Sequence, residues 1–331
     1  MIRILLTGAS GFLGSHILSR IASLESYEII ALYRNSKASV ENISISKNSI
    51  KWVQGDINDI VLLQELMASA DVVIHAAGNV SMKKRDRKNL YKDNVEATTN
   101  MVNMALECGV KKFVYISSTT SLGRRKKRET IDETAKWVDS PFNSYYGITK
   151  FYAEQEVWRA YHEGLNTTII CPSLILGPAT DFSRSSIKLV YSIAEGLKYY
   201  PTGSNGFVDV RDVASAVLLA MNGVYDGNRY ILSACNLGYR ELMAKIADHL
   251  GVPSPYKKIA GIYKVLAKIA AWYGDTFGSK ESFISSDALM TGMLELRYDA
   301  SLSERELGVK YRPMEETIRD MVESYKASVR D

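Results

Sequence analysis

The feature that most constrains the fold is a short apolar run that leads directly into a glycine turn. Ile2-Arg3-Ile4-Leu5-Leu6 holds four apolar residues in five and is followed by TGASGFLG, residues 7–14. A run with so many apolar residues predicts a strand that is buried on both faces, as in the middle of a parallel sheet. Such a strand needs helices on either side, and residues 15–18 continue as the first of them. The opening of the chain therefore predicts an α/β fold.

The spacing of Gly8, Gly11 and Gly14 predicts a dinucleotide-binding turn. A small first residue lets the chain reverse, a small second lets backbone N–H groups approach a pyrophosphate, and a small third lets the helix pack close to the strand. The helix N-terminus then offers unpaired donors and partial positive charge to the phosphates. A plain tight turn is the alternative, but the position between a strand and a helix favours the nucleotide. The predicted cofactor contacts at this turn are Thr7, Gly8, Ser10, Gly11, Phe12, Leu13 and Gly14.

The end of the second predicted strand, residues 28–33, indicates which cofactor the turn would bind. In such a fold a carboxylate here would accept hydrogen bonds from the ribose hydroxyls of NAD, but the chain continues as Arg34-Asn35-Ser36-Lys37. Arg34 and Lys37 could instead pair with the 2′-phosphate of NADP, because a guanidinium matches phosphate oxygens. A solvated basic turn is the alternative. The sequence favours NADP and leaves NAD possible.

Two further apolar segments extend the predicted sheet. Residues 51–57 predict a third strand, followed by a helix near residues 59–68. Residues 71–78 predict a fourth strand that ends in Ala76-Ala77-Gly78, where small side chains leave space for the cofactor. His75 in this segment has no acidic or nucleophilic partner nearby in sequence, so we expect a packed, hydrogen-bonded histidine rather than a catalyst.

The candidate catalytic residues lie at the end of one predicted strand and at the start of the helix that follows it. Residues 112–118 predict a fifth strand that ends at Ser118, and residues 143–150 predict the first turns of a helix. Tyr146 and Lys150 are four residues apart, so they share one face of that helix. An ammonium beside a phenol favours the phenolate and would lower a pKa that starts at about 10, so that Tyr146 could exchange a proton with a substrate oxygen. Ser118 could hydrogen-bond the same oxygen.

A single Tyr-x-x-x-Lys is common on helix surfaces, but here it follows a glycine turn and a strand-end serine in the right order. Together these motifs resemble the extended short-chain dehydrogenases/reductases, in particular the dihydroflavonol-reductase-like group of the NAD-dependent epimerase/dehydratase family. TGASGFLG is similar to their TGxxGFLG signature, and residues 171–178 are similar to their RPxxVxGP segment, with Cys171 in place of the usual Arg. The resemblance covers nearly the whole chain.

The resemblance implies a Rossmann-type doubly wound parallel sheet in residues 1–170, to which the chain returns around residues 205–235. Residues 171–204 and 236–331 would form a smaller C-terminal substrate-binding lobe. The implied catalytic residues are Ser118, Tyr146, Lys150 and Asn94, the last of them fixing backbone near the active site. Further cofactor contacts, expected from the residues or implied by the resemblance, are Arg34, Lys37, Asp56, Ile57, Ala76, Ala77, Gly78, Ser117, Tyr146, Lys150, Pro172 and Leu174.

The leading functional hypothesis is an NADP-dependent reductase that converts an aldehyde or ketone to an alcohol. Tyr146 would protonate the carbonyl oxygen, Lys150 would lower the tyrosine pKa and hold the nicotinamide ribose, and Ser118 would orient the carbonyl. A nucleotide-sugar epimerase, which uses the same three residues, is the alternative. Dehydratases of the group usually carry Asp-Glu after the serine, whereas this chain has Thr119-Thr120. A cofactor-sensing protein that has lost catalysis would lack the tyrosine or the lysine, and both are present.

Positive charge is concentrated in two short segments. The net charge is +4, yet residues 83–88 carry +4 and residues 124–128 carry +5, which leaves −5 for the rest. Each segment follows a strand at the edge where such folds bind ligands, so the two could attract an anionic substrate such as a nucleotide-sugar or a coenzyme A thioester. Solvated loops are the alternative. No aromatic platform accompanies the charges, so nucleic acid is not an expected partner.

The number and spacing of the cysteines indicate the redox environment of the protein. The three cysteines are far apart, without disulfide or metal-ligand spacing: Cys108, Cys171 and Cys235. They predict thiols in a reducing compartment and no metal site.

The first strand begins at Ile2, which leaves no room for a signal peptide and predicts a cytoplasmic protein. Residues 259–273 are too short and too charged to span a bilayer and predict an amphipathic lobe helix. The resemblance implies a homodimer through the helices that carry Asn94 and Tyr146.

Overall fold

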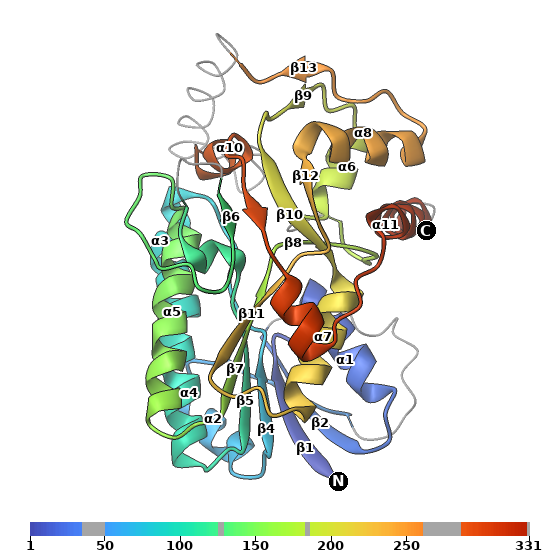
Figure 1. The fold of residues 1–331 in the computed structure, drawn as a ribbon. Helices are drawn as coiled ribbons and strands as arrows, with labels where there is room; N and C mark the ends of the chain where they lie inside the picture. The colour runs from blue at the N-terminus through green and yellow to red at the C-terminus, as the bar shows by residue number, and fades with distance from the viewer. Residues whose placement is uncertain (35–49, 125–128, 183–185, 261–285, 330–331) are drawn as a thin grey trace.

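A seven-stranded parallel sheet forms the centre of the molecule (Figure 1). The computed structural model describes residues 1–34, 50–124, 129–182, 186–260 and 286–329. The strand order is β11 (Asn228–Leu232), β7 (Thr167–Pro172), β5 (Lys112–Ile116), β4 (Val72–His75), β1 (Ile2–Thr7), β2 (Tyr27–Tyr33) and β3 (Ile50–Gln54). The chain runs outward from β1 to β3 and then crosses to β4, so the order reverses between β1 and β4. Ligands bind at this reversal point in doubly wound sheets. The predicted fold class is confirmed.

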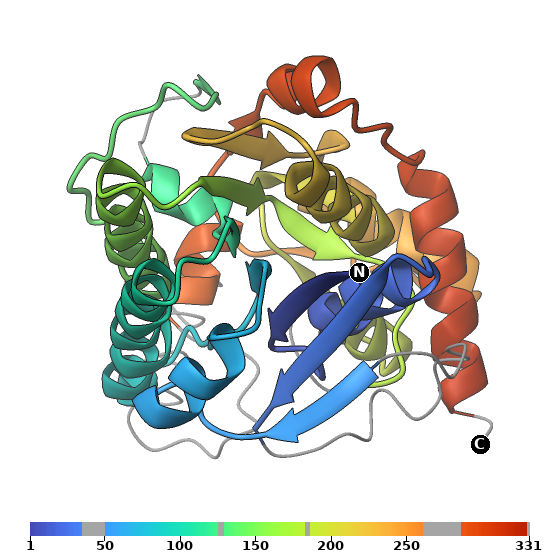
Figure 2. The ribbon, with the colours of Figure 1, turned by 90° about the horizontal axis from the view of Figure 1, so that it is seen from below.

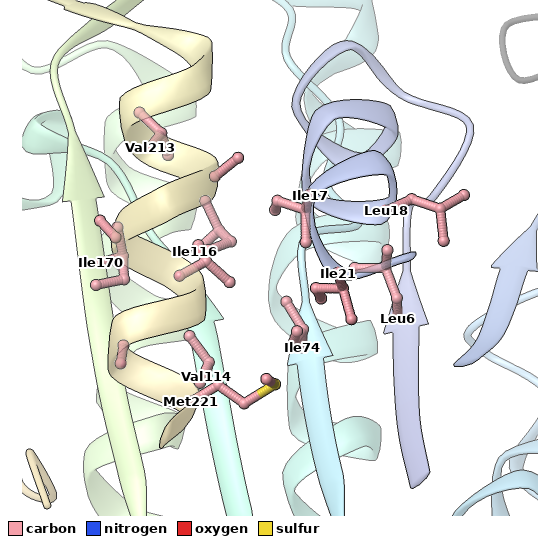
Figure 3. Close-up of a cluster of buried hydrophobic side chains, with 14 of the residues drawn as sticks. Leu6, Ile17, Leu18, Ile21, Ile74, Val114, Ile116, Ile170, Val213 and Met221 are labelled. Atoms are coloured by element: carbon pink, nitrogen blue, oxygen red, sulfur yellow. The ribbon is translucent and has the colours of Figure 1, made fainter. Parts of the chain in front are cut away.

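Alternate residues of the strands pack against helices on opposite faces of the sheet. Leu6 and Ile74 pack with α1 (Phe12–Ala22), and Val114 and Ile170 pack with α7 (Val210–Asn222), as Figure 3 shows. On the other face lie α2 (Ile60–Met67), α4 (Ala97–Glu107) and α5 (Tyr145–His162). Figure 2 shows α4 and α5 together on one side of the strands. Burial on both faces explains why β1 is almost uniformly apolar.

The helix that carries Asn94 contains a π-helical turn. It is built from α3 (Arg87–Tyr91), η2 (Lys92–Glu96) and α4 without a break. Asn94 lies in the π-helical turn and is buried. Such turns recur at functional sites because they redirect a side chain out of the regular helical pattern.

The first basic segment is exposed at Lys84, Arg85, Arg87 and Lys88 but forms helical turns, and of the second segment only Arg124 is described. The first lies in helical turns, η1 (Lys84–Asp86) and the start of α3. In the second, Arg124 follows η3 (Thr119–Leu122) and is buried. Residues 125–128 lie outside the described ranges.

A smaller unit lies at the carboxyl edge of the large sheet. Its three-stranded sheet consists of β8 (Leu174–Leu176), β10 (Ser204–Asp209) and β12 (Cys235–Gly238). Its other elements are α6 (Lys188–Ala194), β9 (Tyr199–Tyr200), α8 (Tyr239–Leu250), β13 (Lys257–Lys258), α10 (Ser286–Gly292) and α11 (Met314–Ser328), whereas η4 (Ser303–Leu307) packs against α7 and β11 of the large sheet. The return predicted around residues 205–235 is made by α7 and β11, whereas β10 pairs with β8 and β12 instead.

Late residues of the chain also pair with an early loop. β14 (Arg297–Tyr298) forms a parallel pair with β6 (Thr130–Ile131), between η3 and α5. Most of the predicted amphipathic helix, residues 261–273, lies outside the described residues, as does Lys37. Among the helices that are described, none is both long enough and apolar enough to cross a membrane.

Candidate active site

The glycine turn after β1 leaves no space for side chains. Gly8 has a φ of +71°, and a Cβ there would lie 2.7 Å from the backbone nitrogen of Ala77. A Cβ at Gly14 would lie 2.0 Å from the carbonyl oxygen of Gly8. A Cβ at Gly11 would lie 3.2 Å from that same oxygen. The turn is therefore folded tightly on itself and against the end of β4, as a backbone that must approach a ligand requires.

The N-terminus of α1 has no side-chain cap. Its N-cap is Gly11, which has no side chain to bond the first N–H groups. By contrast α2, α5 and α7 begin with side-chain caps from Asp59, Ser144 and Asp209. The first N–H groups of α1, at Phe12 and Leu13, thus point to a site for an anion. The turn and the uncapped helix fit the pyrophosphate of a dinucleotide.

We expect Gly14→Ala to impair both folding and cofactor binding. The added methyl group would meet backbone atoms of Gly8, which cannot move aside without opening the turn. Overpacking of this kind costs about 1–3 kcal/mol of stability. Gly238→Ala is the matched control, because a Cβ there lies 4.0 Å from its nearest neighbour. Urea unfolding and titration with NADPH measure both effects, and equal behaviour of the two variants would contradict the proposed role of the turn.

His75 links the glycine turn to the helix that carries Asn94. Thr98 Oγ1 donates to the carbonyl oxygen of Asn94 over 2.6 Å, so it accepts from His75 Nε2 at 3.1 Å. His75 Nδ1 then accepts from Thr7 Oγ1 at 2.8 Å, and Thr7 accepts from the N–H of Ala77. Burial lowers the pKa of His75 to about 3, which keeps the ring neutral. His75 is packed and hydrogen-bonded, as predicted.

Asn94 fixes the backbone that follows β4. Its Oδ1 accepts from the N–H of Asn79 at 2.7 Å, and its Nδ2 donates to the carbonyl oxygen of Asn79 at 3.0 Å. The same Nδ2 donates to Thr149 Oγ1, on α5 beside Lys150. A Cβ at Gly78 would lie 3.4 Å from Asn94 Oδ1 and 3.9 Å from Lys150 Nζ. Asn94 therefore joins the end of β4 to the helix that carries Lys150.

Ser118 and Tyr146 come together at the carboxyl end of β5. Ser118 caps η3, where its Oγ accepts from the N–H of Thr120, and Ser144 caps α5. The two segments pack closely, because a Cβ at Gly147 of α5 would lie 3.0 Å from the carbonyl oxygen of Thr120. Burial raises the pKa of Tyr146 to about 12, although a hydrogen bond with Ser118 acts in the opposite direction. The phenol is therefore neutral at physiological pH.

The hydrogen bonds of Lys150 described in this structure go to β5 and not to Tyr146. Its Nζ donates to the carbonyl oxygen of Ile116 at 2.6 Å and to Tyr115 Oη at 3.0 Å. Burial lowers the pKa of Lys150 to about 8. The expectation that Lys150 lowers the pKa of Tyr146 is wrong in this structure, because desolvation of the phenol dominates and the ammonium has other partners. The sequence analysis did not predict Tyr115 as a hydrogen-bond partner of Lys150. Its place in the apolar strand β5 was the signal that could have suggested this role.

Glu154 is the centre of a buried polar cluster that sequence reasoning missed. It lies one turn beyond Lys150 on α5 and is 1% exposed. Its Oε2 accepts from Ser117 Oγ and Ser121 Oγ, each at 2.7 Å, and its Oε1 accepts from Arg229 Nη1 at 2.7 Å. Burial and the nearby carboxylate raise the pKa of Cys171 far above its usual range. The hydroxyl of Ser117, predicted to contact the cofactor, is thus held by Glu154. Glu154 lies four residues after Lys150 and so shares its helix face, which was the signal in the sequence that could have indicated its burial.

The predicted adenosine contacts lie at the ends of β2 and β3. Arg34 Nη1 forms an exposed ion pair with Asp93 at 3.3 Å. Asp56 accepts from both the N–H and the Nδ2 of Asn58, each at 2.9 Å, and the backbone bond is the main cause of its lowered pKa. Asp56 therefore forms the turn into α2, and its contact with adenine stays a prediction.

The remaining predicted contacts lie at or beyond the carboxyl ends of strands, at the same edge as the glycine turn. Ile57 follows β3, Ala76, Ala77 and Gly78 follow β4, Pro172 ends β7, Leu174 begins β8, and Ser10, Phe12 and Leu13 lie between β1 and α1. The structure thus brings these residues, Ser118, Tyr146 and Lys150 to one edge of the sheet.

Known proteins are similar to this chain in sequence and in architecture. The model of the NAD dependent epimerase/dehydratase family matches residues 4–233. A Synechocystis sp. protein named as a dihydroflavonol 4-reductase is 29% identical over 96% of this chain and 92% of its own. Cinnamoyl-CoA reductase 1 of Petunia hybrida is 27% identical over 75% of this chain and 78% of its own. A dTDP-glucose 4,6-dehydratase from Streptomyces venezuelae, solved with NAD bound, has a TM-score of 0.79 at 22% identity, covering 98% and 97% of the two chains.

Proposed function

The chain belongs to the NAD-dependent epimerase/dehydratase family, and from that membership we propose that it reduces a carbonyl substrate to an alcohol with NADPH. At the coarser level it is an NAD(P)-dependent oxidoreductase of the extended short-chain dehydrogenase/reductase type. The names of its sequence relatives support reduction, since two of them are reductases of carbonyl compounds or thioesters.

The neutral phenol of Tyr146 carries the proposal. A reductase must deliver a proton to the carbonyl oxygen, and a phenol with a pKa of about 12 holds its proton at physiological pH. Ser118 hydrogen-bonds this phenol, so both groups can meet the same oxygen. NADPH, when bound, supplies the hydride. The pKa of Lys150, about 8, leaves it mostly protonated at neutral pH, and its hydrogen bonds with Ile116 and Tyr115 hold the end of β5 next to the serine turn.

A substrate screen separates this function from the epimerase alternative, which structural neighbours such as a UDP-glucose 4-epimerase from Thermotoga maritima keep open. NADPH oxidation should be followed by absorbance with aldehydes, ketones, coenzyme A thioesters and nucleotide-sugars. We expect substrate-dependent oxidation with at least one carbonyl compound. Interconversion of two nucleotide-sugars without net cofactor consumption would establish the epimerase instead.

We expect Arg34→Asp to weaken the binding of NADPH far more than the binding of NADH. Arg34 stands at the end of β2, where a guanidinium can bind the 2′-phosphate, and its ion pair with Asp93 is exposed and weak. Loss of a charged hydrogen bond, about 1.5–3 kcal/mol, corresponds to roughly a 10- to 150-fold loss of NADPH affinity. Arg20→Asp, on the exposed end of α1, is the charge-matched control. Titration of both cofactors checks the result, and equal losses for NADPH and NADH would overturn the NADP assignment.

A further inference from the structure

Arg124 is a buried cation whose hydrogen-bonding capacity is largely unused. The residue follows η3 and is only 3% exposed. Its Nη1 donates to Thr291 Oγ1 at 2.6 Å, whereas its Nε is buried with no hydrogen-bond partner. Burial lowers the pKa of the guanidinium, but a guanidinium stays charged in proteins. A buried charge without a counter-charge is costly, so folding alone does not explain this residue.

Three other arginines in the described part of the chain, which are more exposed than Arg124, have ion-pair partners. Each is paired with a buried carboxylate: Arg229 with Glu154, Arg211 with Asp209, and Arg312 with Asp212. Arg229 also has a buried Nε without a partner, but its charge is neutralised by Glu154. Arg124 forms no such ion pair with any described carboxylate, although it is well buried.

The neighbours of Arg124 are mostly neutral. Tyr298 and Tyr239 lie close enough to act on its charge, and burial raises the pKa of both phenols, so they are protonated. Asp287 also acts on Arg124, but its Oδ2 accepts from the N–H of Tyr145 at 3.2 Å. The surroundings of the guanidinium thus combine two phenols and one hydroxyl with a carboxylate that is bound elsewhere.

These neighbours connect Arg124 to the catalytic residues from two sides. Thr119, next to Ser118, hydrogen-bonds Tyr298. Tyr145, next to Tyr146, bonds Asp287, and Asp287 lies on α10 with Thr291. Through Tyr298 and α10, Arg124 is therefore linked to both the serine turn and the start of α5.

We propose that Arg124 binds an oxyanion of the substrate, a carboxylate or a phosphate, while the carbonyl group faces Tyr146. The inference rests on the proposed function and deepens it by naming the substrate class. A guanidinium edge formed by Nε and a terminal nitrogen matches two oxygens of such a group. The substrate would supply the ion-pair partner that none of the described carboxylates provides. Because the charge is buried, the interaction should persist at high salt, unlike attraction by exposed lysines and arginines.

Ligand-induced stabilisation of the protein in the presence of NADP tests this without requiring turnover. The probes are inorganic phosphate, UDP-glucose, coenzyme A and benzoate, with uncharged benzaldehyde for comparison. We expect one or more anionic probes to raise the melting temperature, since a ligand that binds only the folded state stabilises it. That shift should disappear in Arg124→Gln and remain in Arg297→Gln, whose side chain is exposed beside Tyr298. It should persist in 0.5 M salt, a concentration that screens surface charges to within about 5 Å.

The outcomes separate this proposal from the proposed function. Failure of every anionic probe to stabilise the wild-type protein would overturn it, whatever the reductase screen shows. So would an Arg124→Gln variant that loses stabilisation by NADP and by the anions alike, because that pattern marks a purely structural residue. Arg124→Lys keeps the charge and should retain part of the shift. If a substrate is found, Arg124→Gln should raise its KM by about 10- to 100-fold with little change in kcat.

Discussion

Tyr146→Phe is expected to lower kcat by about 10²–10⁴-fold while the affinity for NADPH stays nearly unchanged. The substitution removes only the hydroxyl that donates a proton to the substrate oxygen. The aromatic ring keeps its place at the start of α5, because the helix is capped independently by Ser144. Steady-state rates and cofactor titration on the same preparation measure the two quantities.

Tyr152→Phe is the matched control, since this tyrosine lies on the same helix and is half exposed. It should retain full activity. If Tyr146→Phe also retained activity, the proton would have to come from another group, and the reductase mechanism proposed here would be wrong. If the variant lost NADPH binding as well, Tyr146 would be a cofactor contact first and a proton donor second.

Glu154→Ala is expected to destabilise the protein by about 3–5 kcal/mol, because it breaks a buried ion pair at one end. Arg229 would remain buried without its carboxylate, and the hydroxyls of Ser117 and Ser121 would lose their acceptor. Since Ser117 and Ser121 flank Ser118, the serine turn would also lose its anchor to α5. Urea unfolding measures the free energy of unfolding, and kcat reports on the serine turn.

Glu156→Ala serves as the control on the same helix. Its ion pair with Arg159 is partly exposed, and such pairs contribute at most about 1 kcal/mol. Combining Glu154→Met with Arg229→Met should recover part of the lost stability, because the unpaired charge is removed. A loss below about 1 kcal/mol for Glu154→Ala would mean that the cluster is hydrated and does not hold the serine turn.

Local sequence patterns predicted the features that depend on neighbouring residues. The apolar run before Gly8 indicated a strand in the middle of a parallel sheet, and β1 lies there between β4 and β2. The spacing of Tyr146 and Lys150 indicated one helix face, and Ser144 begins that helix. These predictions succeeded because hydrophobic period, glycine spacing and capping act within a few residues.

Features that depend on tertiary packing were not predictable in the same way. Lys150 was expected to face Tyr146, but its partner Tyr115 comes from β5, 35 positions earlier in the chain. Arg124 opens a run of five basic residues, a pattern typical of solvated chain, yet it is enclosed by residues near position 290. Glu154 was overlooked because an acid on a helix is usually exposed. In each case the partner lies far away in sequence.

The contacts around α10 have a consequence for biosynthesis. Arg124 meets a partner 167 positions later, and Tyr145 meets one 142 positions later. A nascent chain on the ribosome therefore cannot complete this centre until almost nine-tenths of the polypeptide has been translated. Until then the enzyme exists as a nucleotide-binding half with an unfinished substrate side.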